Sequence, residues 1–85
     1  MTFRIEIDNF LKHPDIQPDP VHEGVYHLTI GIFELTIDDQ QMIVALRDTE
    51  DSLTLYHMEA EEDFEFLILI NEALKVAKKF GRVNG

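Results

Sequence analysis

The side chains best suited to binding a metal ion lie together in one short part of the chain. Residues 14–24 contain all three prolines, and this segment with the histidine before it supplies five candidate ligands: His13, Asp15, Asp19, His22 and Glu23. Their spacing matches no known metal-binding motif, and histidines near carboxylates are expected by chance in a chain with 17 acids. We therefore predict no metal site and no cofactor.

Other reactive side chains fall where a structural role explains them. The carboxylates at 38–39 and 48–51 lack the spaced ligands and central glycine of a calcium loop. They are more simply turn residues, because Asp bonds its local backbone. Ser52 is the only serine and lies in a turn without a strand–turn–helix elbow. His27 and His57 fall on predicted strands, where a solvent-facing or hydrogen-bonded histidine is expected. We predict that the protein is not an enzyme.

The length and composition indicate one small globular domain over residues 1–85. Hydrophobic residues make up 45% and charged residues 28% of the 85 positions, which is enough apolar material for one core. The absence of cysteine excludes disulfides and thiolate metal sites. The longest apolar runs, including 66–70, have five residues and are too short to cross a membrane, and no apolar secretory segment begins the chain. We predict a cytoplasmic protein without membrane contact.

The charge is strongly acidic and unevenly spread. Seventeen acids and seven bases give a net charge of −10, which argues against direct binding of nucleic acid. Residues 1–65 hold sixteen acids and three bases, whereas residues 66–85 hold one acid and four bases. This surface either keeps the protein soluble or steers a basic partner into contact. The predicted acidic surface comprises Asp38, Asp39, Asp48, Glu50, Asp51, Glu61 and Glu62.

The first apolar segment fits two kinds of secondary structure. Phe3, Ile5 and Ile7 alternate with polar residues, which is the periodicity of a strand. Phe10 and Leu11 also share one helical face with Phe3 and Ile7. The β-branched residues favour the strand, followed by a helical turn.

Four further segments have the composition of β-strands: 26–30, 33–37, 42–46 and 53–58. Alternate apolar residues change parity between the first and second segments, so we expect a bulge or tight bend at Gly31. Short turns between consecutive strands predict an antiparallel meander.

From residue 63 to residue 80 the apolar period becomes helical. Acids lie at its start and Lys78 and Lys79 near its end, as the helix dipole favours, and Gly81 is placed just past the C-cap. An apolar stripe is expected to pack on the sheet: Phe66, Leu69, Ile70, Ala73, Ala77 and Phe80. The predicted fold class is therefore α+β, an antiparallel β-meander of about four strands packed against a long C-terminal α-helix.

The same helix carries apolar residues outside its packed stripe. Phe64 and Ile68 fall on the opposite side, with Leu67 between the two faces. Such a patch either meets another subunit or partner, or lies beneath the N-terminal segment or the proline loop.

The strands at 26–46 and 53–58 resemble the strand meander of the small acidic type III secretion chaperones, and the helix at 64–80 is similar to their closing helix. The resemblance covers about residues 25–80. It implies a homodimeric protein-binding module that holds a segment of a client protein. That family usually begins with an amphipathic helix and has a further helix and strand before its last helix, which this chain is too short to contain.

Under this resemblance the client contacts are the patch Phe64, Leu67 and Ile68 together with the strand residues Phe33, Leu35, Met42 and Val44. Each strand residue also fits plain core packing. Two other functions fit the residues: an acidic inhibitor or nucleic-acid mimic that neutralises a basic nuclease or DNA-binding protein, and a metal-dependent enzyme that uses residues 13–23.

Overall fold

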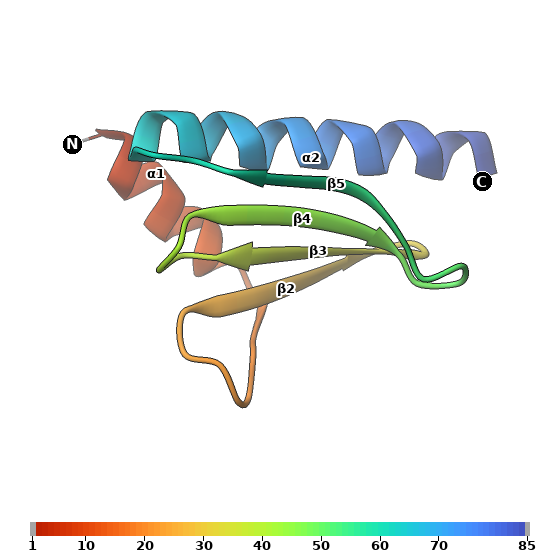
Figure 1. Ribbon diagram of the computed structural model, residues 1–85, viewed down its shortest axis with the longest axis horizontal. Helices are drawn as coiled ribbons and strands as arrows, with labels where there is room; N and C mark the ends of the chain where they lie inside the picture. Colours follow the sequence, from red (N-terminus) through yellow and green to blue (C-terminus); the bar gives the residue numbers. More distant parts are fainter. Residues whose placement is uncertain (1, 85) are drawn as a thin grey trace.

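The protein folds as an antiparallel sheet with both helices associated with it (Figure 1). The computed structural model describes residues 2–84, and side chains from 3 to 80. The elements are α1 (Thr2–Leu11), β1 (Gln17–Pro18), β2 (Val25–Ile30), β3 (Phe33–Asp38), β4 (Ile43–Asp48), β5 (Leu53–Glu59) and α2 (Asp63–Asn84). The strands lie in the order β1-β2-β3-β4-β5, all antiparallel, so the predicted α+β meander is confirmed. It has five strands rather than about four, because the proline loop adds the two-residue β1.

The core lies between α2 and one face of β3 and β4. Phe33, Leu35 and Ile37 alternate as fully buried residues on β3, and Val44 and Leu46 do so on β4. The buried positions of α2 are Phe66, Leu69, Ile70, Ala73 and Ala77, which confirms most of the predicted stripe. The small alanines allow the helix to approach the sheet closely.

Residues 2–11 form helix α1, so the preference for a strand there was wrong. Ile7 is fully buried in the core, and Phe10 and Leu11 pack against it from the same helical side. Arg4 bonds Asp8 one turn away, at 2.7 Å between Nη2 and Oδ1. Contacts with α2 and these ion pairs outweigh the weak strand propensity of the β-branched residues.

The bend at Gly31 is a hairpin turn and not a bulge. Ile30 pairs directly with Phe33, which leaves Gly31 and Ile32 as a two-residue turn with a φ of 61° at Gly31. Glycine at the first central position suits the type II′ turn. The hairpin itself changes the parity, because residues of opposite parity face one another across it.

The β3–β4 and β4–β5 loops share one construction. In each, an aspartate at the end of the strand, Asp38 or Asp48, accepts hydrogen bonds from two backbone amides further along. Each loop ends on a residue with a φ of 55°, Met42 or Ser52, directly before the next strand. The turn role of these aspartates is confirmed, and β4 begins at Ile43 rather than Met42.

Helix α2 runs to Asn84, so Gly81 lies within it and does not end it. Phe80, expected in the packed stripe, keeps 44% of its surface exposed although its ring lies 6.3 Å from that of Phe33. Over the described residues, neither helix combines the length and apolar content that crossing a membrane requires.

Candidate functional site

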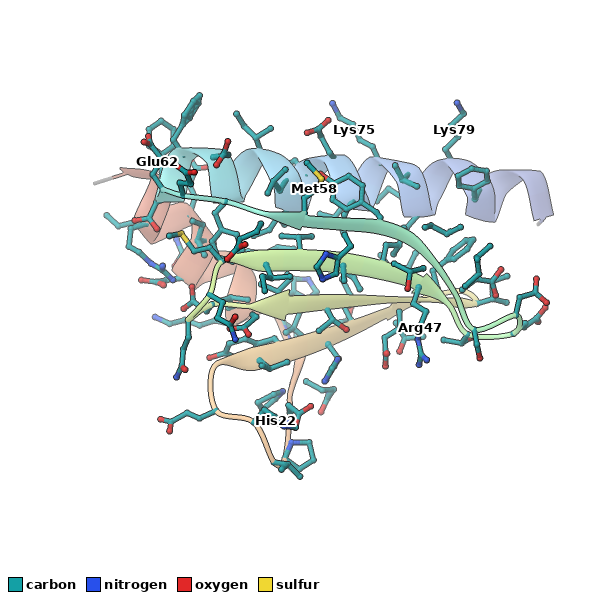
Figure 2. All side chains as sticks on the ribbon, viewed as in Figure 1. His22, Arg47, Met58, Glu62, Lys75 and Lys79 are labelled. Carbon is teal, nitrogen blue, oxygen red and sulfur yellow. The ribbon has the colours of Figure 1, made fainter. Side chains whose placement is uncertain are left out.

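One side of α2 faces away from the sheet and changes character along its length. We call Phe64, Ile68, Lys75 and Lys79 the outer stripe, because steps of three, four and seven residues place side chains on one helical face. Phe64 and Ile68 are 44% and 43% exposed, and the two lysines are exposed. Figure 2 shows Lys75 and Lys79 extending away from the sheet. The stripe is apolar where α2 begins and basic toward its end.

The lysines of this region have no acidic partner within the described part of the chain. Among side chains 3–80, none of the ion pairs involves Lys75, Lys78 or Lys79, whereas Arg4 and Arg47 each pair with carboxylates. Unpaired ammonium groups on a helix attract phosphates or other anions.

Phe64 is part of an exposed aromatic pair. Its ring lies 5.3 Å from that of Phe3 on α1, with the planes tilted by 43°. Phe3 is also 44% exposed. The N-terminal helix therefore touches this side of α2 without covering it. Leu67, the third residue of the predicted patch, is half-buried against the core.

The predicted strand contacts have a different place in the structure. Phe33, Leu35 and Val44 are buried core residues, at 3%, 0% and 0% exposure, so their side chains are not available to a partner. Met42 is half-buried in the β3–β4 loop. The alternation that suggested a contact surface is the alternation that fills the core, and the sequence alone allowed both roles.

A concave region lies where α1, β2 and α2 meet. This cleft of about 380 Å³ has a floor of apolar side chains and a more polar rim. Its lining residues are Phe10, His13, Asp15, Ile16, Leu28, Thr29, Ile30, Leu74 and Lys78. The cleft joins segments that are distant in the sequence, so no local pattern indicated it.

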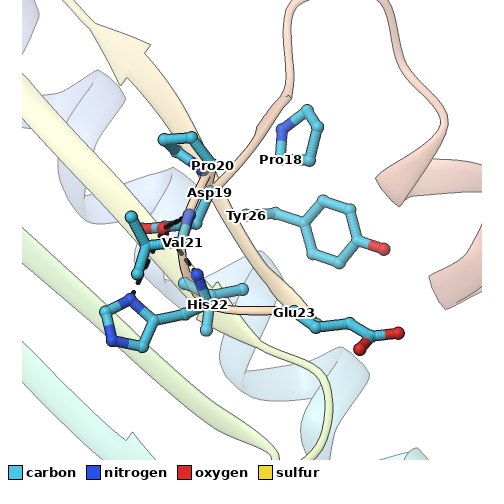
Figure 3. Close-up of a pocket in the computed structure, with 9 residues that line it drawn as sticks. Pro18, Asp19, Pro20, Val21, His22, Glu23 and Tyr26 are labelled. Carbon is cyan, nitrogen blue, oxygen red and sulfur yellow. Dashed lines mark hydrogen bonds and ion pairs between the residues drawn. The ribbon is translucent and has the colours of Figure 1, made fainter.

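The proline loop is organised around Asp19 (Figure 3). One carboxylate oxygen accepts hydrogen bonds from the backbone amides of Val21 and His22, at 2.8 and 2.9 Å. The other lies 2.8 Å from Nε2 of His27, whose Nδ1 is 3.1 Å from the hydroxyl of Thr36. Together these bonds hold the pKa of the Asp19 carboxyl well below its usual value, and the bond with His27 lowers this pKa the most.

These contacts give Asp19 a structural role. The carboxylate ties the loop to β2, and His27 continues the link to β3. A hollow of about 340 Å³ is lined by loop residues beside it. The expected hydrogen bonding of His27 is present, whereas its partner Asp19 could not be identified from spacing alone.

The structure separates the five candidate metal ligands. Nδ1 of His13 lies 3.7 Å from the Asp15 carboxylate, and His22 lies 3.4 Å from Asp19 at another part of the loop. Within the described residues, no group of three or more His, Asp or Glu side chains is arranged to hold a metal ion.

The predicted acidic surface is divided between two ends of the molecule. Asp39 bonds Arg4, whose guanidinium also contacts Asp63 at the start of α2, so the β3–β4 loop lies at that end. Glu61 and Glu62 precede α2 there. Asp48, Glu50 and Asp51 lie in or beside the β4–β5 loop, toward the end where α2 finishes (Figure 1). The seven acids therefore do not form one continuous face.

Comparison with known proteins indicates a relationship that the pattern of strands did not. Over 95% of its length the chain is similar to the transcription antitermination protein NusB of Histophilus somni (strain 2336), with 31% identity over 90 residues. The chain spans 60% of the length of that protein. No family model matches the chain, and no solved structure matches it.

This similarity contradicts the resemblance to type III secretion chaperones, and the chaperone function is corrected with it. That resemblance rested on strand alternation, acidity and size, which unrelated small α+β proteins share because they solve the same packing problem. The match rests on residue identities along nearly the whole chain.

The expectations about partners are corrected as well. A secretion client, a basic target for an acidic inhibitor, and a homodimer all followed from the overturned functions. The exclusion of direct nucleic-acid contact came from the net charge, which averages over the whole chain. Binding depends on local charge, and residues 66–85 hold four of the seven bases and only one of the acids. The relative is named for a role in transcription rather than for a reaction.

Proposed function

We propose that this chain acts in transcription antitermination without enzymatic activity, and that it contacts single-stranded RNA along the outer stripe of α2. The observation that carries the role is the similarity to NusB across 95% of the chain. Because the chain spans 60% of that protein's length, the role of the whole relative is proposed here and not transferred. A cytoplasmic location and a single domain over 1–85 belong to the same proposal.

The chemistry of the outer stripe supports RNA as the molecule contacted. Proteins that bind single strands combine cations that follow the backbone with aromatic side chains on which bases stack. Phe64 supplies an exposed ring, and Lys75 lies eleven residues further, about 16 Å along a helix. That distance is short enough for one strand to reach both Phe64 and Lys75.

The overall charge limits how strong this contact can be. A net charge of −10 repels a polyanion, so binding has to depend on the few unpaired lysines. Each phosphate neutralised releases counterions, and log affinity falls with log salt by about 0.7 per contact for single strands. We expect a slope of about −1.4 for contacts from the two lysines of the outer stripe.

Binding is tested by fluorescence anisotropy with a labelled single-stranded RNA at increasing salt. The double variant Lys75→Gln/Lys79→Gln is expected to lower affinity about tenfold at low salt and to flatten the salt slope. The control Lys12→Gln/Arg47→Gln changes the net charge equally but lies off α2. Equal losses in both variants would indicate a nonspecific charge effect and would contradict the proposed surface.

Stacking is tested separately with two matched phenylalanine variants. Phe64→Leu is expected to weaken RNA binding about fivefold, because base–aromatic stacking contributes about 1–3 kcal/mol per base. Phe80→Leu is the control, since Phe80 has the same 44% exposure but lies off the outer stripe. An equal loss of RNA affinity in the two variants would show that Phe64 is not part of the RNA-binding site.

The role itself is tested by transcription in vitro across an intrinsic or factor-dependent terminator. Addition of the protein, with the remaining factors of its host's antitermination system, should increase the fraction of transcripts that read through. Lys75→Gln/Lys79→Gln should abolish the increase. Unchanged read-through with the unaltered protein would reject the proposed function.

A further inference from the structure

The cleft between α1, β2 and α2 has the construction of a small-molecule site. Five apolar side chains form its floor: Phe10, Ile16, Leu28, Ile30 and Leu74. Its volume of about 380 Å³ lies at the lower end of the range for ligand pockets, which favours a compact ligand. Apolar floors supply most of the binding free energy, and a few polar groups at the rim decide which ligand enters.

The rim presents a cation that the described protein does not neutralise. Lys78 lines the cleft, and no carboxylate among side chains 3–80 forms an ion pair with it. A strongly hydrated ammonium beside an apolar floor favours a ligand that carries its own anionic group.

A second hydrogen-bond donor lies on the same rim. Nδ1 of His13 accepts a hydrogen bond from the Asp15 amide at 3.1 Å, so the neutral ring carries its proton on Nε2. The Asp15 carboxylate is the opposing charge, but its side chain is 76% exposed and therefore well screened.

We propose that this cleft binds a small amphipathic carboxylate, with the apolar body on the floor and the carboxylate at Lys78. A single lysine matches one monoanion, whereas a phosphate dianion would meet one cation and the nearby Asp15. The proposal does not depend on the role in transcription, because it uses a different surface of α2 from the outer stripe.

The probe for this site is 4-phenylbutyrate, with the neutral 4-phenylbutanamide as its matched control. Titration followed by amide chemical shifts is expected to give saturable changes confined to residues 10–16, 28–30 and 74–78. The carboxylate should bind about fivefold more tightly than the amide, as expected for one charge-assisted hydrogen bond at a partly exposed site. Equal affinities, or shifts that do not saturate, would overturn the proposal.

Two adjacent lysines provide the matched variants. Lys78→Met should remove the preference for the carboxylate while leaving the affinity for the amide unchanged. Lys79→Met carries the same change of charge but does not line the cleft, so its preference should remain. Loss of the preference in both variants would show a general effect of charge and would overturn the assignment to this cleft. RNA binding without carboxylate binding would reject this site alone, and the reverse would reject the proposed function alone.

Discussion

Asp19, Asp38 and Asp48 use their carboxylates in the same way. Each accepts hydrogen bonds from two backbone amides two and three residues further along the chain. This local bonding makes aspartate a preferred turn residue. These three of the 17 acidic residues therefore have a structural role, and Asp19 differs from the others because it also bonds a histidine.

Asp19 is expected to make stability depend on pH in the acid range. Its pKa is lowered in the folded state from an ordinary value of 3.8, so the unfolded chain binds the proton more readily. The stabilisation is fully present above about pH 4 and is lost as the pH falls through the lower folded pKa. Urea unfolding of Asp19→Asn between pH 5 and the acid limit should show a shallower pH dependence than the unaltered protein.

The control for this prediction is Asp15→Asn. It removes the same charge from the same loop, but the Asp15 carboxylate accepts none of these backbone bonds. An identical change of slope in both variants would show that general charge, and not the Asp19 bonds, causes the effect.

Substitutions at two glycines distinguish the cost of backbone strain from the cost of steric contact. Gly31 has a φ of 61° and an added Cβ would have no neighbour within 4 Å, so Gly31→Ala should cost about 1 kcal/mol of unfolding free energy through strain alone. Gly24 has a φ of 85° and a Cβ there would lie 2.8 Å from Cγ of Gln40, so Gly24→Ala should cost more. In the Gly24→Ala background, Gln40→Ala should recover only the steric part, as measured by urea denaturation.

At the scale of elements, one arginine joins three segments. Arg4 of α1 bonds Asp8 within its helix, Asp39 of the β3–β4 loop at 2.8 Å, and Asp63 of α2 at 3.4 Å. The bonds to Asp8 and Asp39 raise the pKa of Arg4 further above its already high value. These bonds hold α1 at the start of α2, where Phe3 meets Phe64.

Arg4→Gln is expected to lower the unfolding free energy by about 1 kcal/mol, since a network of partly exposed pairs exceeds a single surface pair. The loss should shrink at high salt because the ion pairs are screened. Amide exchange should quicken in α1 more than in β3 and β4. Arg47→Gln, which removes one 3.6 Å pair with Glu34, is the control. Uniform exchange throughout the chain would contradict a local role for Arg4.

At the scale of the whole molecule, groups of acidic residues lie near both ends of α2. The β4–β5 loop acids lie toward the end where α2 finishes, and Glu61 and Glu62 lie at its start (Figure 1). Lys79 is nearer the former, and Debye screening limits interactions to about 10 Å at 0.1 M salt. The affinity for RNA should therefore depend on where the acidic residues lie and not only on how many there are.

We expect Glu50→Gln/Asp51→Asn to increase RNA affinity about twofold at low salt, because it removes repulsion near the lysine end of α2. Glu61→Gln/Glu62→Gln changes the charge equally at the other end and should have a smaller effect on the salt slope. Anisotropy titrations compare the two. A larger effect from the second pair would place the RNA at the start of α2.

Residues close in sequence made part of this structure predictable. Asp38 and Asp48 indicated their turns, and the apolar period of 63–80 indicated α2, because turn bonds and helical periodicity involve neighbours within a few positions. Of the outer stripe, Phe64 and Ile68 were recognisable from the sequence as lying on the side of the helix opposite the packed stripe. That these side chains are exposed and form one surface follows only from the packing of the other side of α2 against β3 and β4.

What the sequence alone determined is the α+β class, the antiparallel meander and the two aspartate turns. Only the tertiary structure decided that residues 2–11 are a helix, that Phe33, Leu35 and Val44 are core, and that Lys78 borders a cleft. The physical reason is the range of the interactions. Arg4 and Asp63 are 59 positions apart, and Phe10 meets Leu74 around one cleft, so their contacts exist only once the sheet and both helices have packed together.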